Sequence, residues 1–247
     1  MFINSMLSEP KTTFSAKDSG LVFTWAVLFI NIAALAVAII LSELISETAL
    51  EYISLASIQI TMILTCRIYC KKRGINFVKA IKLNKNVSGK NTFASIGLGV
   101  TMMYASVILI LLFTEFLELI GYTQPDIPLT IFTVQDLILG TIFYAMLPAI
   151  CEEILMRGIV FQGLRKFGDF YAITVSAALF MLMHANPMQT VFPLIAGLTL
   201  GYVFLKTGNI IYPMIIHFIN NFISVLLEYG ANNMDMPEPE PVNEIFL

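Results

Sequence analysis

The chain has few charged residues for its length. Of its 247 residues, 13% are Asp, Glu, Lys or Arg, whereas 57% are hydrophobic, and the mean hydropathy is +0.82. A soluble domain of this size needs more charge to cover its surface. The composition therefore excludes an ordinary soluble protein and predicts one membrane-embedded domain. The net charge of −3 is too small to indicate a nucleic-acid partner.

Cysteine is scarce too, and two common protease motifs are missing. Cys66, Cys70 and Cys151 lie in or beside apolar runs, and they form no Cys-x-x-Cys pair. An odd number without such a pair argues against a disulfide framework. The chain also lacks Gly-x-Ser-x-Gly and His-Glu-x-x-His, which disfavours the serine and zinc chemistries that those motifs support.

Long hydrophobic runs fill most of the chain. A membrane-crossing helix needs about 20 mostly apolar residues, and seven segments reach or approach that length: 20–42, 50–70, 93–120, 137–164, 171–188, 190–205 and 210–229. The predicted fold is all-α, a polytopic transmembrane helical bundle of about seven spans. We expect a cytoplasmic N-terminal segment (1–19), a transmembrane domain (20–230) and a disordered acidic, proline-containing tail (231–247).

The basic residues are distributed on one side of these spans. If the N-terminus is cytoplasmic and the chain crosses seven times, all fourteen Lys and Arg residues fall on the cytoplasmic side. Acidic residues gather in the opposite loops and in the tail. Because basic loops remain in the cytoplasm, the pattern predicts a multi-pass protein of the cell membrane with its C-terminus outside.

Two adjacent carboxylates lie inside the fourth apolar run. A charge near the bilayer centre costs at least about 2.5–3.5 kcal/mol, so Glu152 and Glu153 need partners or water. Glu153 and Arg157 are four residues apart and can pair on one helix face. Glu152 points about 100° away from Glu153 and has no nearby cation on its helix. An unpaired carboxylate of this kind is typical of a general acid or base. A helix-end ion pair is the alternative, but the apolar run continues past Arg157.

Both histidines of the chain lie in later apolar segments. His184 follows Phe180 by four residues and Asn221 follows His217 by four, so each pair shares a helix face. Glu152 and His184 are equally far along the chain from the turn between their spans, which puts them at one depth. The sequence therefore predicts one water-accessible cavity lined by Glu152, Glu153, Arg157, His184, His217 and Asn221.

In this order on separate apolar helices, the three motifs resemble those of the CPBP intramembrane proteases, which include the CAAX prenyl proteases. The motifs are Glu152-Glu153-x-x-x-Arg157, Phe180-x-x-x-His184 and His217-x-x-x-Asn221. The resemblance covers about residues 137–227 and implies a catalytic core in the last four spans. It implies that Glu152 and His184 activate water, that His217 and Asn221 stabilise the oxyanion, and that Glu153, Arg157 and Phe180 shape the site.

The sequence leaves the cofactor and part of the function open. Glu152, His184 and His217 could form a zinc site with one open position, or they could act without metal, which we slightly favour. The expected function is endopeptidase activity in the lipid bilayer on a membrane-embedded or lipid-anchored peptide or protein. One alternative is a non-proteolytic regulator that binds helices of a partner such as a sensor kinase. Another is a transporter with an acidic proton relay.

The charge pattern predicts the membrane topology. In a background without the native cysteines, Asn233→Cys should react with an impermeant maleimide applied outside intact cells. Lys90→Cys should react only after the membrane is opened, because its loop is predicted to be cytoplasmic. Labelling of position 233 from the cytoplasmic side alone would contradict the predicted orientation.

Overall fold

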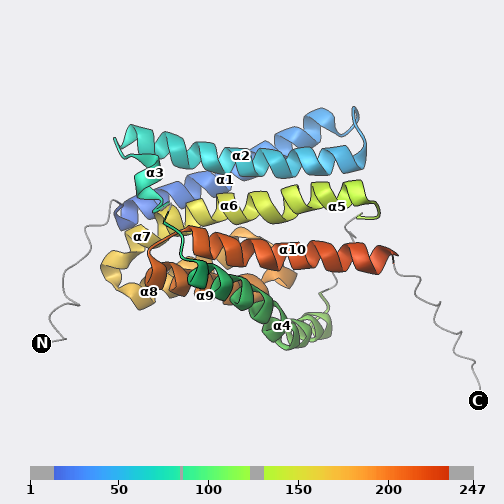
Figure 1. Cartoon of the computed structure of the whole chain (residues 1–247). Coiled ribbons are helices and arrows are strands. Elements are labelled where there is room, and N and C mark those ends of the chain that lie inside the picture. Colours follow the sequence, from blue (N-terminus) through green and yellow to red (C-terminus); the bar gives the residue numbers. More distant parts are fainter. Residues whose placement is uncertain (1–13, 84–85, 123–130, 234–247) are drawn as a thin grey trace, which may run out of the picture.

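The computed structural model describes residues 14–83, 86–122 and 131–233, and within these ranges every regular element is helical. Figure 1 shows long helices that run side by side, with the start of α1 and the end of α10 at opposite ends of the bundle. The helices of the first half are α1 (Ala16–Leu41), α2 (Glu47–Lys72), α3 (Phe77–Ala80) and α4 (Gly89–Leu119). Those of the last third are α8 (Asp169–Met183), η5 (Pro187–Gln189), α9 (Val191–Thr207) and α10 (Ile211–Asn233).

Between these two groups, the helix that carries the two glutamates departs from regular α geometry. It runs without a break from 134 to 167 as α5 (Val134–Gly140), η2 (Thr141–Met146), α6 (Leu147–Leu155), η3 (Met156–Val160), α7 (Phe161–Leu164) and η4 (Arg165–Phe167). The segments η2 and η3 are π-helical turns on either side of α6. Such wide turns are frequent at functional sites, and here they flank the segment that carries Glu152 and Glu153.

The predicted all-α transmembrane bundle is confirmed. Within the described ranges, six helical segments are long and apolar enough to cross a membrane, and α8 is a shorter apolar helix. The first and last helices are longer than the apolar runs from which they were predicted. Helix α1 starts inside the predicted N-terminal segment because Ser15 and Asp18 form a capping box, and α10 extends to Asn233. The rest of the predicted tail, 234–247, lies outside the described residues.

The prediction of which span is short was wrong. We expected a short sixth span, but Pro187–Thr207 covers 21 residues, whereas α8 has only 15 residues and ends at Met183. The cause is local, since Ala185 has a left-handed φ of 48° and Asn186 precedes a proline. Both features end an α-helix. The end of α8 therefore places His184 at a helix terminus.

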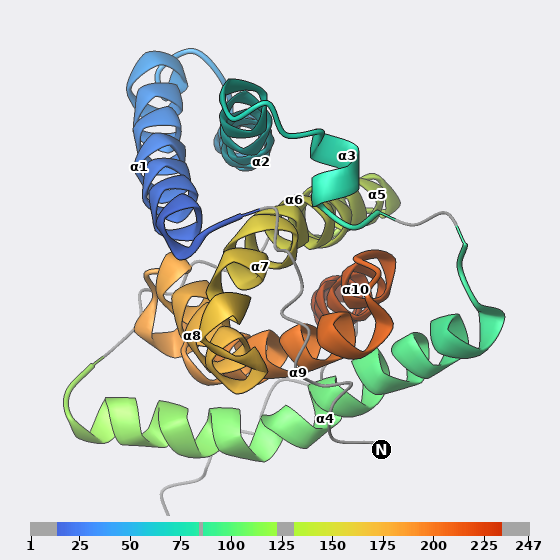
Figure 2. The same ribbon diagram turned by 90° about the vertical axis from the view of Figure 1, so that its left-hand side faces the viewer.

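The helix at 134–167 and α10 lie at the centre of the bundle. Figure 2 shows them between the α1–α2 hairpin on one side and α4 on the other, with α8 and α9 completing the ring. Helix α10 packs against α4, η2, α6 and α9, and α2 packs against α6. Several of the largest fully buried side chains lie between residues 153 and 161. The candidate site is thus built on the most enclosed helix of the fold.

Helices α8 and α9 approach each other closely at a glycine. A Cβ atom added to Gly197 would lie 2.7 Å from Cα and 2.8 Å from Cβ of Ala177. Small residues commonly permit such close contacts between membrane helices. The contact matters for the site because it also fixes the position of the Gly197 carbonyl.

This close contact predicts opposite effects for one substitution at two glycines. Gly197→Ala should lower the free energy of unfolding by about 1–3 kcal/mol, because α8 and α9 must move apart. Gly97→Ala on α4 meets nothing within 4 Å and should leave stability unchanged or raise it by up to about 1 kcal/mol through helix propensity. Unfolding in detergent micelles measures both. Equal effects at the two positions would contradict the close contact.

Candidate active site

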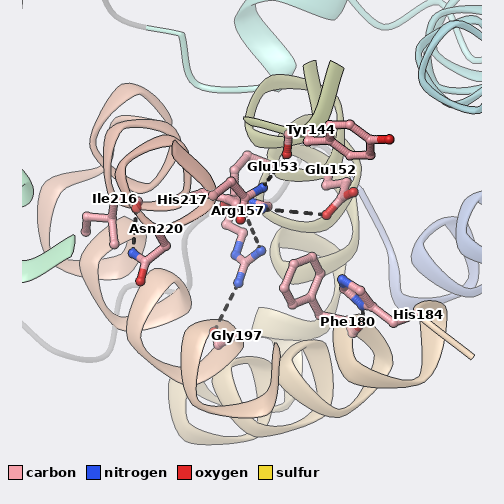
Figure 3. Close-up of polar contacts among 11 residues, drawn as sticks. Tyr144, Glu152, Glu153, Arg157, Phe180, His184, Gly197, Ile216, His217 and Asn220 are labelled. Atoms are coloured by element: carbon pink, nitrogen blue, oxygen red, sulfur yellow. Dashed lines mark hydrogen bonds and ion pairs between the residues drawn. The ribbon is translucent and has the colours of Figure 1, made fainter. Parts of the chain in front are cut away.

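The Glu153–Arg157 pair lies wholly inside the protein. Both side chains are 0% exposed, and Arg157 Nη1 lies 2.8 Å from Glu153 Oε1. Arg157 Nη2 also donates a hydrogen bond of 3.1 Å to the carbonyl of Gly197 on α9 (Figure 3). The predicted pairing along one helix face is confirmed. Because both charges are enclosed and paired, the guanidinium joins the glutamate helix to α9.

His217 is oriented by the same carboxylate oxygen. Its Nδ1 lies 3.1 Å from Glu153 Oε1, and its Nε2 lies 3.9 Å from Glu152 Oε2. An ionised carboxylate can only accept hydrogen bonds, so the contact with Glu153 requires a hydrogen on Nδ1. Glu153 thereby orients the ring so that Nε2 faces Glu152. Carboxylates orient catalytic and metal-binding imidazoles in the same way.

His184 is oriented differently, by the backbone. Its Nδ1 lies 2.8 Å from the carbonyl oxygen of Phe180, so Nδ1 donates and Nε2 is free to accept. The Phe180 ring stands edge to face with both imidazoles, at 5.0 Å from His184 and 5.8 Å from His217. The Arg157 guanidinium lies over the same ring at 5.0 Å. Phe180 therefore separates the two histidines and covers the buried cation.

A cavity of 340 Å³ opens beside these groups. It is lined by Glu152, His184, His217 and Asn221, together with apolar side chains from α4, α9 and α10. The prediction of one shared cavity is confirmed for these four residues. It was wrong for Glu153 and Arg157, which are enclosed beneath the cavity wall, where they pair with each other and Arg157 bonds to the Gly197 carbonyl. Glu153 Oε2 and Arg157 Nε have no hydrogen-bond partner among the described residues. Glu152 Oε2 has no hydrogen-bond partner among the described residues.

Asn221 is held in place by a feature of the π-helical turn. Pro148 has no N–H, so the carbonyl of Tyr144, four residues earlier, lacks its usual α-helical donor. Asn221 Nδ2 donates a hydrogen bond of 3.1 Å to that carbonyl. The second hydrogen of the same amide stays available to the cavity. The amide of Asn221 is thereby attached to the π-helical turn that contains Tyr144.

The motif-based prediction missed Asn220. This residue is 1% exposed and lines the cavity, and its Nδ2 donates 2.7 Å to the carbonyl of Ile216. Its Oδ1 has no partner among the described residues. The spacing of His217, Asn220, Asn221 and Ser224 places all four on one face of a helix. That polar face was visible in the sequence and could have identified Asn220.

The described part of the chain contains no group of three or more His, Cys, Asp and Glu side chains arranged to hold a metal ion. The set suggested for zinc, Glu152, His184 and His217, does line one cavity. Only the Glu152 and His217 side chains of this set form a contact with each other, at 3.9 Å. In the observed arrangement, His184 instead faces the cavity from the opposite side of the Phe180 ring.

Comparison with known proteins gives one match. Residues 134–223 match a family model described as Rce1-like, type II CAAX prenyl endopeptidase. All seven motif residues fall inside this segment, and the resemblance to the CAAX protease family is confirmed. The match supports a CAAX-type intramembrane endopeptidase as the general class of activity. No curated protein and no solved structure matches the chain.

The burial of Arg157 predicts a large effect on stability. Arg157→Ala leaves Glu153 enclosed without its cation and should cost roughly 3–5 kcal/mol. Arg165→Ala is the matched control, because Arg165 pairs with Asp169 at 2.8 Å in a partly exposed position and should cost under about 1 kcal/mol. Glu152→Gln should cost much less than Arg157→Ala, since Glu152 borders the cavity, its Oε2 has no hydrogen-bond partner among the described residues, and its one charged neighbour, His217, is 3.9 Å away. Denaturant titration in detergent measures all three. A loss at Arg157 no larger than at Arg165 would contradict the enclosed pair.

Proposed function

Because residues 134–223 match the Rce1-like CAAX prenyl endopeptidases, we propose that this chain is an intramembrane endopeptidase. Its substrate would be a membrane-associated protein or hydrophobic peptide. The observation that carries the proposal is the cavity on which Glu152, His184, His217 and Asn221 converge from three helical segments. Burying an acid, two imidazoles and an amide in an apolar bundle is costly. Polar groups that remain in such a place usually have a function.

The proposed charge state makes the site neutral as a whole. Glu152 and Glu153 supply two negative charges, and Arg157 supplies one positive charge. A doubly protonated His217 supplies the second, with one carboxylate at 3.1 Å from Nδ1 and another at 3.9 Å from Nε2. A balanced set is the arrangement that an apolar interior tolerates best.

We assign water activation to Glu152 and His184. The two side chains line the same cavity from α6 and from the end of α8. His184 donates from Nδ1 to a neutral carbonyl, so a neutral ring presents the Nε2 lone pair to the cavity. A carboxylate and an imidazole that both accept hydrogen bonds can hold a water molecule and remove its proton as it attacks. The water oxygen then bonds to the carbonyl carbon of the substrate.

We assign oxyanion stabilisation to His217 and Asn221. A charged His217 donates from Nε2, and Asn221 has a second amide hydrogen beside the one bonded to Tyr144. Both donors lie in the cavity wall before the reaction begins, as transition-state stabilisation requires. When the tetrahedral intermediate breaks down, the carbon–nitrogen bond cleaves. The proton taken from water passes through Glu152 to the leaving amine.

The proposed enzyme works without a metal ion. A chelator that binds zinc should then leave cleavage unchanged, and added zinc should not increase it. The zinc alternative predicts that a chelator, His184→Ala or His217→Ala would each stop the reaction completely. Loss of activity in chelator that is restored by zinc would overturn the metal-free assignment while keeping the endopeptidase.

Substitutions in the cavity should separate chemistry from folding. With a quenched fluorescent peptide carrying an S-farnesyl cysteine followed by three residues, Glu152→Gln should abolish cleavage while the protein stays folded. His217→Ala and Asn221→Ala should each lower turnover by about 10²–10³-fold if they are oxyanion donors. Glu115→Gln on α4, away from the cavity, is the matched control and should cleave like wild type.

Cleavage by Glu152→Gln at the wild-type rate would contradict the proposed endopeptidase. A wild-type biological output from that variant, without any cleavage, would instead favour a membrane regulator that binds helices of a partner.

A further inference from the structure

A second cleft reaches the same two catalytic side chains from the opposite side. It has a volume of 240 Å³ and is lined by Glu152 and His184, by residues of α1 and α2, and by the end of α8. The α1 residues are Val27, Ile30, Asn31 and Ala34. In Figure 3, the blue ribbon of α1 lies on the side of Glu152 and His184 that faces away from Asn220. Glu152 and His184 therefore stand between two cavities.

Asn31 is an unusual residue for its position. It is one of two polar side chains between Leu21 and Leu41, the other being Thr24. Its side chain is exposed, and its Nδ2 donates 2.8 Å to the carbonyl of Val27, so one amide hydrogen and the Oδ1 acceptor are available to a further partner. A polar side chain within a membrane helix usually faces a cavity or a partner. Asn31 lies in the wall of the cleft that leads to Glu152.

Asn31 also lies at the depth of the catalytic pair. It is 15 residues beyond the first residue of α1, Glu152 is 15 residues before the end of η4, and His184 is 15 residues beyond the start of α8. These three helix ends lie at the same end of the bundle in Figure 1. At ~1.5 Å per residue, all three side chains are about 22 Å from that end. The amide and the catalytic groups therefore share one level.

The position of α1 is fixed by contacts at its beginning. Ser19 Oγ donates 2.9 Å to the carbonyl of Val160, and a Cβ atom on Gly163 would overlap Ser19 and the Ser15 backbone. Asp18 accepts a hydrogen bond from Tyr69 of α2. These contacts hold the first turns of α1 against α7 and α2. The second half, which carries Asn31 and Ala34, is left to border the cleft.

From these observations we propose that the α1 cleft is the second half of the substrate-binding site, an inference that rests on the proposed function. An extended peptide would cross Glu152 and His184, with one flank of its scissile bond in the 340 Å³ cavity and the other in the cleft. Inside a membrane, each peptide N–H and carbonyl needs a hydrogen-bond partner. A carboxamide offers both a donor and an acceptor, so Asn31 would bind the backbone of that flank.

The experiment compares variants of α1 on a series of peptides. The probes are quenched peptides with an S-farnesyl cysteine followed by three residues, at full length and shortened on either side of the cleavage point found by mass spectrometry. Asn31→Ala and Ala34→Phe are tested beside Ala38→Phe, the same substitution one turn further along α1 and outside the cleft. Thermal unfolding of each variant controls for folding, and Asn31→Ser provides a milder second change.

On the full-length peptide, Asn31→Ala should lower kcat/KM about three- to tenfold, mostly through KM, as expected for one lost hydrogen bond. Ala34→Phe should lower it by tenfold or more, because the ring fills the cleft, whereas Ala38→Phe should match wild type. Shortening the flank that occupies the cleft should abolish the difference between wild type and Asn31→Ala. Shortening the other flank should preserve that difference.

Two results would overturn the inference while wild type remains active and Glu152→Gln remains inactive. If Asn31→Ala, Asn31→Ser and Ala34→Phe all cleave like wild type, the substrate does not use the cleft. If Asn31→Ala and Ala34→Phe lower kcat equally for every peptide length, the cleft serves water entry instead. If wild type and Glu152→Gln do not differ in cleavage, the proposed function itself fails, and the inference fails with it.

Discussion

A single buried carboxylate connects most of the structure around the site. Glu153 Oε1 accepts from Arg157 and lies 3.1 Å from Nδ1 of His217, so one oxygen joins the glutamate helix to α10. Arg157 extends the connection to α9 through the Gly197 carbonyl and to α8 through the Phe180 ring. Because an unpaired charge is very costly in this interior, the four helices are held in one arrangement. Glu152, the neighbouring residue, is thereby left free to face the cavity.

The irregular parts of the backbone serve that arrangement. Tyr144 lies in the π-helical turn η2, and its carbonyl accepts a hydrogen bond from Asn221 of α10. Helix α8 ends at Met183, and Ala185, which follows the capping residue His184, is left-handed at a cost of roughly 1–2 kcal/mol. Strained backbone of this kind persists where the surrounding structure enforces it, often at functional sites. The site therefore depends on irregularities at the ends and turns of helices as much as on the motif residues.

The sequence predicted those parts of the molecule that follow from hydrophobic length and helical spacing. Apolar runs defined the spans, and four-residue spacing correctly paired Glu153 with Arg157. What remained hidden depends on contacts between helices. Spacing alone could not show that Glu153 and Arg157 lie beneath the cavity wall, since that depends on the Gly197 carbonyl of another helix. Asn31 was visible as an isolated amide in an apolar helix, but only the packing of α1 shows that it lines the same cleft as Glu152.

The arrangement of the site depends on a hydrogen that Glu153 holds on Nδ1 of His217, and histidine NMR detects that hydrogen directly. The chain has only two histidines, so ¹⁵N-histidine labelling gives two imidazoles, and His184→Gln assigns them. Nδ1 of His217 should be protonated, with a proton resonance far downfield because its hydrogen bond to a carboxylate is charge-assisted. That resonance should move in Glu153→Gln, while the His184 signals stay unchanged. An unprotonated Nδ1 in His217, or His217 signals that do not respond to Glu153→Gln, would show that Glu153 does not orient this imidazole.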